Sequence, residues 1–185
     1  GEHGPNNLQT ALQQMRAIAP YDSHPVARLV NDDVALIKQY LDVGFQTLLI
    51  PMVDTAEQAA RIVGAMHYPP RGFRGDGAAI ARASRWGQVA DYMDNASAQL
   101  CCLVQAETTA ALSNLEAIAN TDGVDGVFFG PADLSASMGH PGNADHPDVQ
   151  KAIFDGIAVV RRAGKAAGII TTQREAAQAY LTAGA

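Results

Sequence analysis

Apolar residues along the chain follow two alternating spacings. The helical spacing first appears at Leu8, Leu12, Met15 and Ile18, and it recurs around residues 34–41, 59–66, 89–93, 112–118, 149–160 and 176–181. Short continuous apolar runs lie between these segments, at residues 26–30, 47–53, 100–106, 124–129 and 166–170. Continuous runs are typical of strands buried on both faces, as in parallel sheets. The alternation therefore predicts repeated βα units around a parallel sheet.

Polar residues and glycines predict where several of these helices begin and end. Asn31 is the expected N-cap of the second helix, and Gly44 follows its end. Thr55 with Gln58 has the pattern of a capping box before the third helix. Gly164 is expected to stop the long helix that precedes the last strand.

The stretch from residue 68 to residue 85 breaks the alternation. It is rich in Pro, Gly and Arg and is too long for a simple connector, so we expect an ordered loop with a functional role. Trp86, the only Trp, follows this loop and is expected to begin the next helix and to serve packing.

Polar residues at the ends of different strands help to distinguish a closed barrel from an open parallel sheet. His3, Arg28, Glu107 and Asp133 each come just past the C-terminal end of a different strand, the first taken as the tail of a strand that precedes residue 1. A (β/α)₈ barrel gathers its catalytic groups in this way, whereas an open sheet concentrates them at one switch point. No glycine-rich phosphate loop follows a strand. The pattern favours a barrel, and because a full barrel takes about 250 residues, we expect a fragment cut at both ends.

Composition excludes several classes of protein. The chain has 185 residues with 13 basic and 19 acidic side chains, a formal net charge of −6, and no basic stripe, which argues against nucleic acid and anionic membranes as partners. No apolar run approaches the roughly 20 residues that span a bilayer. Two adjacent cysteines cannot make a disulfide framework, so a reducing, cytoplasmic setting is expected.

Two acids are the strongest candidates for a metal site. Glu107 and Asp133 each follow an apolar strand, and two carboxylates converging at a barrel mouth suit a hard divalent cation such as Mg²⁺. Each acid also has a simpler interpretation. Asp133 would favour the first turn of the helix begun by Pro131, and Glu107 would be a solvated strand end.

Three further residues have the chemistry of an active site. The Arg28 guanidinium suits a carboxylate, although an ion pair with Asp32 or Asp33 is the alternative. Gln105 lies two residues before Glu107, so both side chains point to the same side of their strand. The His3 imidazole suits general-base catalysis, although a loop histidine is more often only solvated.

Six motifs occur in order along the chain: GEHGPN, TLLIPMV, YPPRGFRG, ARASRW, VQAET and GVFFGPADLS. Together they resemble the HpcH/HpaI family of metal-dependent (class II) pyruvate aldolases, over essentially the whole chain and close to the 4-hydroxy-2-oxoheptane-1,7-dioate aldolases. The resemblance implies a (β/α)₈ TIM barrel of the phosphoenolpyruvate/pyruvate superfamily, truncated at both ends. Residues 1–185 would form a single partial barrel domain without the first strand, most of the second strand and the last strand.

The resemblance also implies roles for individual residues. Glu107 and Asp133 match the metal ligands, for Mg²⁺ or for Mn²⁺ or Co²⁺. His3 matches the catalytic base, and Arg28 matches the arginine that stabilises the enolate. The substrate contacts are matched by Gln105, Ala132 and Ile170.

Asp42 matches an acid that raises the basicity of the catalytic histidine. We expect this residue at the C-terminal end of a helix, where a negative charge is unfavourable, and on the side of the barrel away from His3. A contact across a subunit interface would reconcile the two positions, since family members are typically homo-oligomers.

The implied reaction is the reversible cleavage of a 4-hydroxy-2-oxo acid to pyruvate and an aldehyde such as succinate semialdehyde, in the catabolism of aromatic compounds. The expected binding partners are therefore small molecules, a 2-oxo acid and an aldehyde. The three lysines lie outside the expected site, which disfavours Schiff-base chemistry. Two alternatives stay open: a citrate-lyase-type enzyme that cleaves CoA esters on the same barrel, and a non-catalytic binder of 2-oxo acids.

Overall fold

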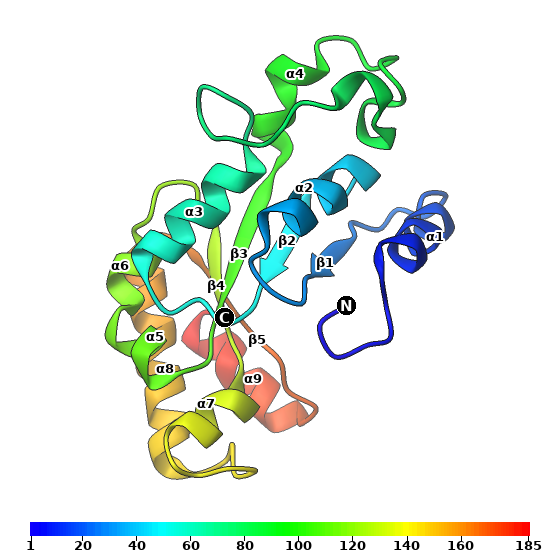
Figure 1. Cartoon of the computed structure of the whole chain (residues 1–185). Coiled ribbons are helices and arrows are strands. Elements are labelled where there is room, and N and C mark those ends of the chain that lie inside the picture. The colour runs from blue at the N-terminus through cyan, green and yellow to red at the C-terminus, as the bar shows by residue number, and fades with distance from the viewer. The chain divides into compact units, whose positions relative to one another are not determined.

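The computed structural model describes residues 1–185 (Figure 1). These residues form two compact units. The first unit consists of residues 1–50 and 61–102, and the second of residues 51–60 and 103–185. Helix α3 (Ala56–Met66) and strand β3 (Cys101–Ala106) each have residues in both units.

The first unit is built on a β-α-β arrangement. Strand β1 (Val26–Arg28) pairs in parallel with β2 (Thr47–Ile50), with Arg28 opposite Leu49. Helix α2 (Val34–Val43) connects them, and α1 (Leu8–Ile18) packs against α2. Four short helices follow: η1 (Ala78–Ile80), η2 (Arg82–Ser84), α4 (Tyr92–Asn95) and η3 (Ala96–Gln99).

The second unit contains three parallel strands in the order β3-β4-β5, with β4 at Gly126–Phe129 and β5 at Ala166–Ile169. Helix α8 (Pro147–Arg162) lies against β4 and β5 and contacts α6 (Leu115–Ala119), α7 (Pro131–Ser137) and α9 (Arg174–Ala183). Gly156 lets α8 come this close, because a Cβ there would lie 2.7 Å from the ring of Phe129. The short helix α5 (Thr109–Ser113) follows β3 and precedes α6.

The predicted α/β pattern with parallel strands is confirmed, and every strand lies within its predicted apolar run. Most strands are shorter than the runs. The run from residue 47 to 53 ends its pairing at Ile50, because the backbone turns at Met52, where φ is +54°. Beyond the strand, Pro51 and Val53 are buried and Met52 is half exposed, so hydrophobicity alone overestimates strand length.

Two of the predicted helix caps are wrong in detail. The N-cap of α2 is Asp33, whose Oδ1 accepts the N–H of Leu36 at 2.8 Å, while Asn31 accepts the N–H of Asp33. At the start of α3, the hydroxyl of Thr55 accepts the N–H of Gln58 as predicted. The side-chain Oε1 of Gln58, however, accepts the backbone N–H of Asp54 at 2.9 Å, whereas a capping box needs the N–H of Thr55.

Two predicted helices are also shorter than their apolar patterns. The helix expected around residues 112–118 is divided into α5 and α6 at Asn114, whose side chain donates to the carbonyl oxygen of Asp54. The helix expected to begin at Trp86 contains only Tyr92–Asn95. Trp86 lies in a turn with φ of +56° and is 64% exposed, so the prediction that it begins a helix is wrong.

The long loop after α3 is ordered by backbone hydrogen bonds. The N–H of Phe73 donates to Gly64 at 2.8 Å, and the N–H of Arg74 donates to His67 at 2.9 Å. Gly72 lies so close to the backbone of Gly64 that a Cβ would be 2.2 Å from its carbonyl oxygen. The loop is therefore a fixed part of the first unit, as its length and composition predict.

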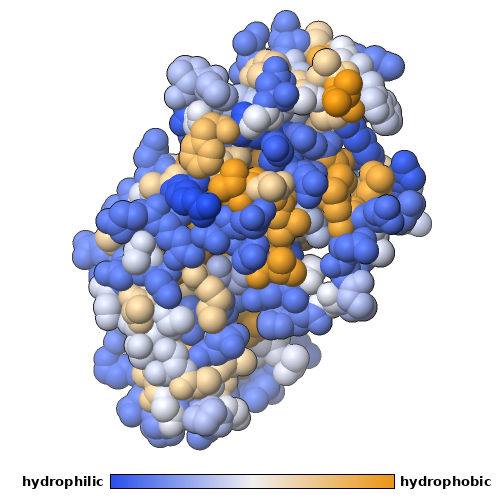
Figure 2. Space-filling model, in the orientation of Figure 1, coloured by the Kyte–Doolittle hydropathy of each residue, from blue (hydrophilic) through white to orange (hydrophobic).

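None of the helices is both long enough and apolar enough to cross a bilayer. On the face drawn in Figure 2, hydrophobic residues form separate patches in a mostly hydrophilic surface.

Candidate active site

Glu107 directly follows β3 and is 1% exposed, so the solvated interpretation of this acid is wrong. Its Oε1 accepts the backbone N–H of Met52 at 2.9 Å, and its Oε2 accepts a short hydrogen bond from the Gln105 side chain. The left-handed turn at Met52 aims that N–H at the carboxylate. A buried charge persists only where donors or counter-charges compensate it, and these two donors hold the carboxylate in one orientation.

Gln105 supplies an acceptor that no protein group uses. Its Nε2 must face Glu107, because a carboxylate only accepts hydrogen bonds. Its Oε1 is then left buried without a hydrogen-bond partner. Buried polar atoms are nearly always paired, so this oxygen is available to accept a hydrogen bond from a ligand or a water.

The chain passes Glu107 again at the end of β4. A Cβ on Gly130 would lie 2.3 Å from Oε2 of Glu107, so only glycine allows this approach. Helix α7 begins at the next residue, with Asp133 exposed in its first turn. Ala132 and Ile170 line the same cavity of about 370 Å³.

Further polar contacts hold the segment that follows β3. The Thr108 hydroxyl donates a short hydrogen bond to Oδ1 of Asp54 and accepts the N–H of Ala111 at the start of α5. Asn114 donates to the backbone of Asp54 at 2.8 Å. Asp54 and Thr108 were not predicted, although each is a polar residue within a few positions of the C-terminal end of a strand.

In the first unit, Glu2 lies between the two predicted catalytic residues. Its Oε2 is 3.2 Å from Nε of Arg28 and 3.6 Å from Nε2 of His3. The Arg28 contact is a close charge pair without a well-directed hydrogen bond. Glu2 was not predicted; its position next to His3 was the available signal.

The acids expected as alternative partners of Arg28 are engaged elsewhere. Asp32 pairs with Arg61 at 3.4 Å, and Asp33 caps α2. Arg28 is therefore in an ion pair, but with Glu2, and about a third of its side chain stays exposed.

Asp42 lies in the last turn of α2, as predicted, and has a structural partner there. Its Oδ1 accepts from Nη2 of Arg74 at 2.6 Å, and the Arg74 side chain is fully buried. The guanidinium lies 4.5 Å over the ring of Tyr68. Burial raises the pKa of Tyr68 to about 12, so this ring stays uncharged. The charge of Asp42 thus compensates a buried cation, which offsets its unfavourable place at a helix C-terminus.

We expect Asp42→Asn to lower the free energy of unfolding by about 2–3 kcal/mol, because it leaves the buried Arg74 charge without its counter-charge. The measurement is urea unfolding followed by circular dichroism, with Asp32→Asn, from an exposed pair, as the matched control. An unchanged midpoint for Asp42→Asn would show that the pair contributes nothing to folding.

The predicted residues thus fall into two sets. His3, Arg28 and Asp42 lie in the first unit, where Glu2 joins the first two. The second unit contains the buried Glu107 with Gln105, and α7 with Asp133, while Ala132 and Ile170 share a cavity. Oxygen donors of the second set suit a hard divalent cation. An imidazole and a guanidinium suit proton transfer and the binding of an anion.

Comparisons with known proteins agree with this chemistry. The family model of the HpcH/HpaI aldolase/citrate lyase family matches residues 1–185. The chain is 58% identical to the hydroxypyruvate/pyruvate aldolase of Pseudomonas aeruginosa over 184 residues, which is all of this chain and 69% of that protein. It is 57% identical to the 4-hydroxy-2-oxo-heptane-1,7-dioate aldolase of Klebsiella pneumoniae, over all of this chain and 70% of that protein.

A solved structure of an HpcH/HpaI aldolase/citrate lyase family protein from Burkholderia cenocepacia has the same fold, with a TM-score of 0.95 at 40% identity. The match covers 99% of this chain and 73% of that one. The predicted fold class is confirmed, since the parallel α/β fold is consistent with a (β/α)₈ TIM barrel and its solved neighbours belong to the same family. With its parallel strands, its buried strand-end carboxylate and relatives named as aldolases, the chain belongs to the HpcH/HpaI aldolase/citrate lyase family of carbon–carbon lyases.

Proposed function

We propose that this protein is a metal-dependent (class II) aldolase that reversibly cleaves a 4-hydroxy-2-oxo acid to pyruvate and an aldehyde. The observation that carries the proposal is the buried Glu107 carboxylate beside the unpaired oxygen of Gln105. The relatives named as aldolases, at 57–58% identity, support this reaction class over a CoA-ester lyase or a non-catalytic binder.

Glu107 and Asp133 would hold a divalent cation such as Mg²⁺, Mn²⁺ or Co²⁺. Both offer carboxylate oxygens, and the Gly130 backbone keeps the space beside Oε2 of Glu107 free of a side chain. The unpaired Gln105 oxygen can accept from a water or a substrate hydroxyl next to the ion. When bound, the cation would supply Lewis-acid polarisation of the 2-oxo group of the substrate.

His3 would act as the base. It accepts the proton of the C4 hydroxyl, the C4 carbon becomes the aldehyde carbonyl, and the electrons of the C3–C4 bond pass to the pyruvate fragment as its enolate. Arg28 holds the developing negative charge with its planar fork of donors. Glu2 lies near both side chains and would set their positions. Protonation of C3 then releases pyruvate.

The substrate contacts would come from Gln105, Ala132 and Ile170. The cavity that contains the last two is also lined by Thr171, Thr172, Gln173 and Asp145, and no Lys or Arg lines it. An acidic aldehyde such as succinate semialdehyde finds no counter-charge among these residues.

Assembly into a homo-oligomer stays a prediction, as does the effect of Asp42 on the basicity of His3. The single partial barrel domain over residues 1–185 is likewise a prediction. None of these is needed for the reaction class proposed above.

The proposal is tested by a retro-aldol assay on the purified protein, with pyruvate release coupled to a dehydrogenase. We expect a 4-hydroxy-2-oxo acid to be cleaved, activity to be lost in EDTA, and added Mg²⁺ or Mn²⁺ to restore it. Cleavage of a CoA ester but of no free 2-oxo acid would identify the citrate-lyase type instead. Binding of oxalate without any turnover or exchange of the pyruvate C3 proton would identify a binder.

A further inference from the structure

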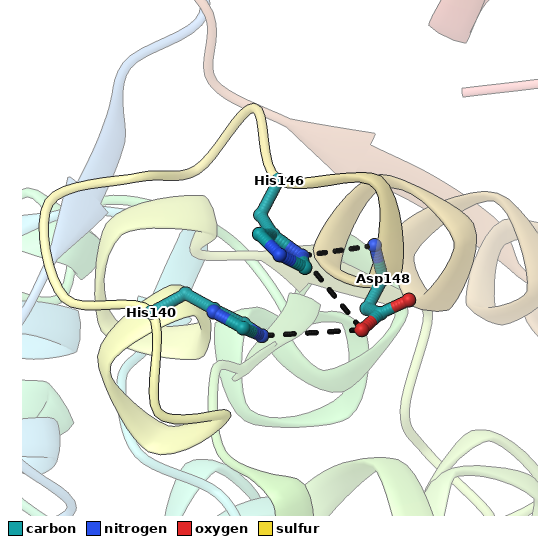
Figure 3. Close-up of side chains that lie close together, drawn as sticks. All are labelled: His140, His146 and Asp148. Carbon is teal, nitrogen blue, oxygen red and sulfur yellow. Dashed lines mark hydrogen bonds and ion pairs between the residues drawn. The ribbon is translucent and has the colours of Figure 1, made fainter.

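The connection between α7 and α8 brings two histidines and an aspartate together (Figure 3). Nε2 of His140 lies 4.0 Å and Nδ1 of His146 lies 3.8 Å from Oδ2 of Asp148. One donor atom from each residue lies within 4.8 Å of the other two. None of the three has a part in the proposed reaction.

The backbone places the two imidazoles before any ligand binds. Gly139 and Gly142 adopt positive φ angles of 85° and 75° that turn the loop. The N–H of His140 donates to Ser135 at 2.8 Å, and the N–H of His146 donates to Asn143 at 3.2 Å. The two rings are stacked with their centroids 3.5 Å apart. Little ordering is therefore needed to bring these donors together, which favours binding.

The cluster is open to solvent. The side chains of His140 and His146 are about 30% exposed, and Asp148 is 71% exposed. An ion can enter from the solvent, and water can complete its coordination. Two imidazoles with one carboxylate form a donor set typical of Zn²⁺ and related transition-metal ions, whereas Mg²⁺ prefers oxygen ligands alone.

Two movements separate this arrangement from a metal site: the Asp148 carboxylate must approach the rings, and the stacked rings must turn until both nitrogens point at one ion. Ligands about 2.0–2.2 Å from a tetrahedral ion lie roughly 3.4 Å from one another, so Oδ2 of Asp148 must approach each imidazole by about half an ångström, and the stacked rings must splay. Nδ1 of His146 already presents a lone pair, which accepts the N–H of Asp148 at 3.2 Å. Metal binding would exchange this helix cap for a coordinate bond.

We propose that His140, His146 and Asp148 bind one divalent transition-metal ion of the Zn²⁺ class, separate from the hard cation proposed at Glu107 and Asp133. The same loop contributes Gly142, Ala144 and Asp145 to the cavity that Ala132 and Ile170 line. An ion bound at the cluster would therefore fix one wall of that cavity.

The test is a Zn²⁺ titration of the purified, tag-free protein against a chromophoric chelator, in excess Mg²⁺. Two variants remove one imidazole each while keeping its structural contact. His140→Phe keeps a stacked ring, and His146→Asn keeps a residue that caps helices well. We expect one tight Zn²⁺ equivalent in the unaltered protein and at least about tenfold weaker binding in both variants. Asp155→Asn, on the exposed side of α8, is the control and should bind normally.

The visible spectrum of Co²⁺ gives a readout that does not depend on activity. Nitrogen ligands in a four- or five-coordinate site give strong absorption bands, and we expect these bands to vanish in His140→Phe and His146→Asn but to persist in Glu107→Gln. Circular dichroism shows whether each variant is folded. If one histidine variant is unfolded, Asp148→Asn, which keeps both imidazole rings, is measured in its place. Unchanged Zn²⁺ binding in the folded variants, or loss of the bands in Glu107→Gln alone, would overturn the proposal.

Discussion

Glu107→Gln is expected to lower kcat/KM for cleavage of a 4-hydroxy-2-oxo acid by about 10³-fold or more, since metal-ion catalysis supplies several kcal/mol of transition-state stabilisation. The fold should be retained. The new amide can still accept the N–H of Met52, and Gln105 can rotate its amide so that its oxygen faces the new NH₂ group. Glu107→Ala should be equally inactive and less stable, because it leaves that N–H unpaired and opens a cavity.

The matched control is Glu116→Gln, an exposed acid on α6 of the same unit. It should retain full activity. The measurement is the coupled pyruvate assay over a range of Mn²⁺ concentrations, with thermal melting to compare the folds. Asp133→Ala should behave like Glu107→Ala in activity, with a smaller effect on stability because Asp133 is exposed. Wild-type metal affinity in either variant would show that the ligands are assigned wrongly.

Arg28→Lys is expected to slow exchange of the pyruvate C3 proton with solvent by about 10²-fold, the scale of losing one donor to a developing oxyanion. A lysine keeps the positive charge, but its ammonium group lacks the planar array of N–H donors that binds a carboxylate and an enolate oxygen together. Exchange needs no aldehyde, so it isolates the enolate step from acceptor binding. Overall cleavage should fall in parallel.

Exchange is followed by proton NMR in D₂O. Arg61→Lys, from the exposed pair with Asp32, is the control and should exchange normally. Arg28 also pairs with Glu2, so a merely structural role predicts a lower melting temperature with near-normal exchange. That outcome would remove Arg28 from the mechanism and leave it as an ordinary ion pair.

Local sequence patterns predicted which helices and strands occur, but they predicted the first and last residues of these elements less well. The buried strand around residues 100–106 and the long amphipathic helix before Gly164 are confirmed. A strand buried on both faces has a continuous apolar run, and a helix buried on one face has apolar residues at helical spacing, so both patterns are easy to recognise. The division of the helix at Asn114 was missed, since it depends on a hydrogen bond to Asp54, 60 residues away in the sequence. Likewise, Asn31 and Asp33 are both good N-cap residues, and the sequence does not show that the helix begins after Asp33.

Which residues stand at strand ends can be read from the amino-acid sequence, and the six motifs identify the family. What surrounds those residues follows from how distant segments pack together. Glu107 is a buried carboxylate with two donors, although the sequence left open a solvated one. Glu2, not Asp32 or Asp33, is the partner of Arg28, and Arg74 neutralises Asp42. His140, His146 and Asp148 meet only because two glycines turn the loop between α7 and α8. The physical reason is the same in each case: periodicity reports burial averaged over an element, whereas ion pairs and donor sets depend on distances between segments that no local pattern records.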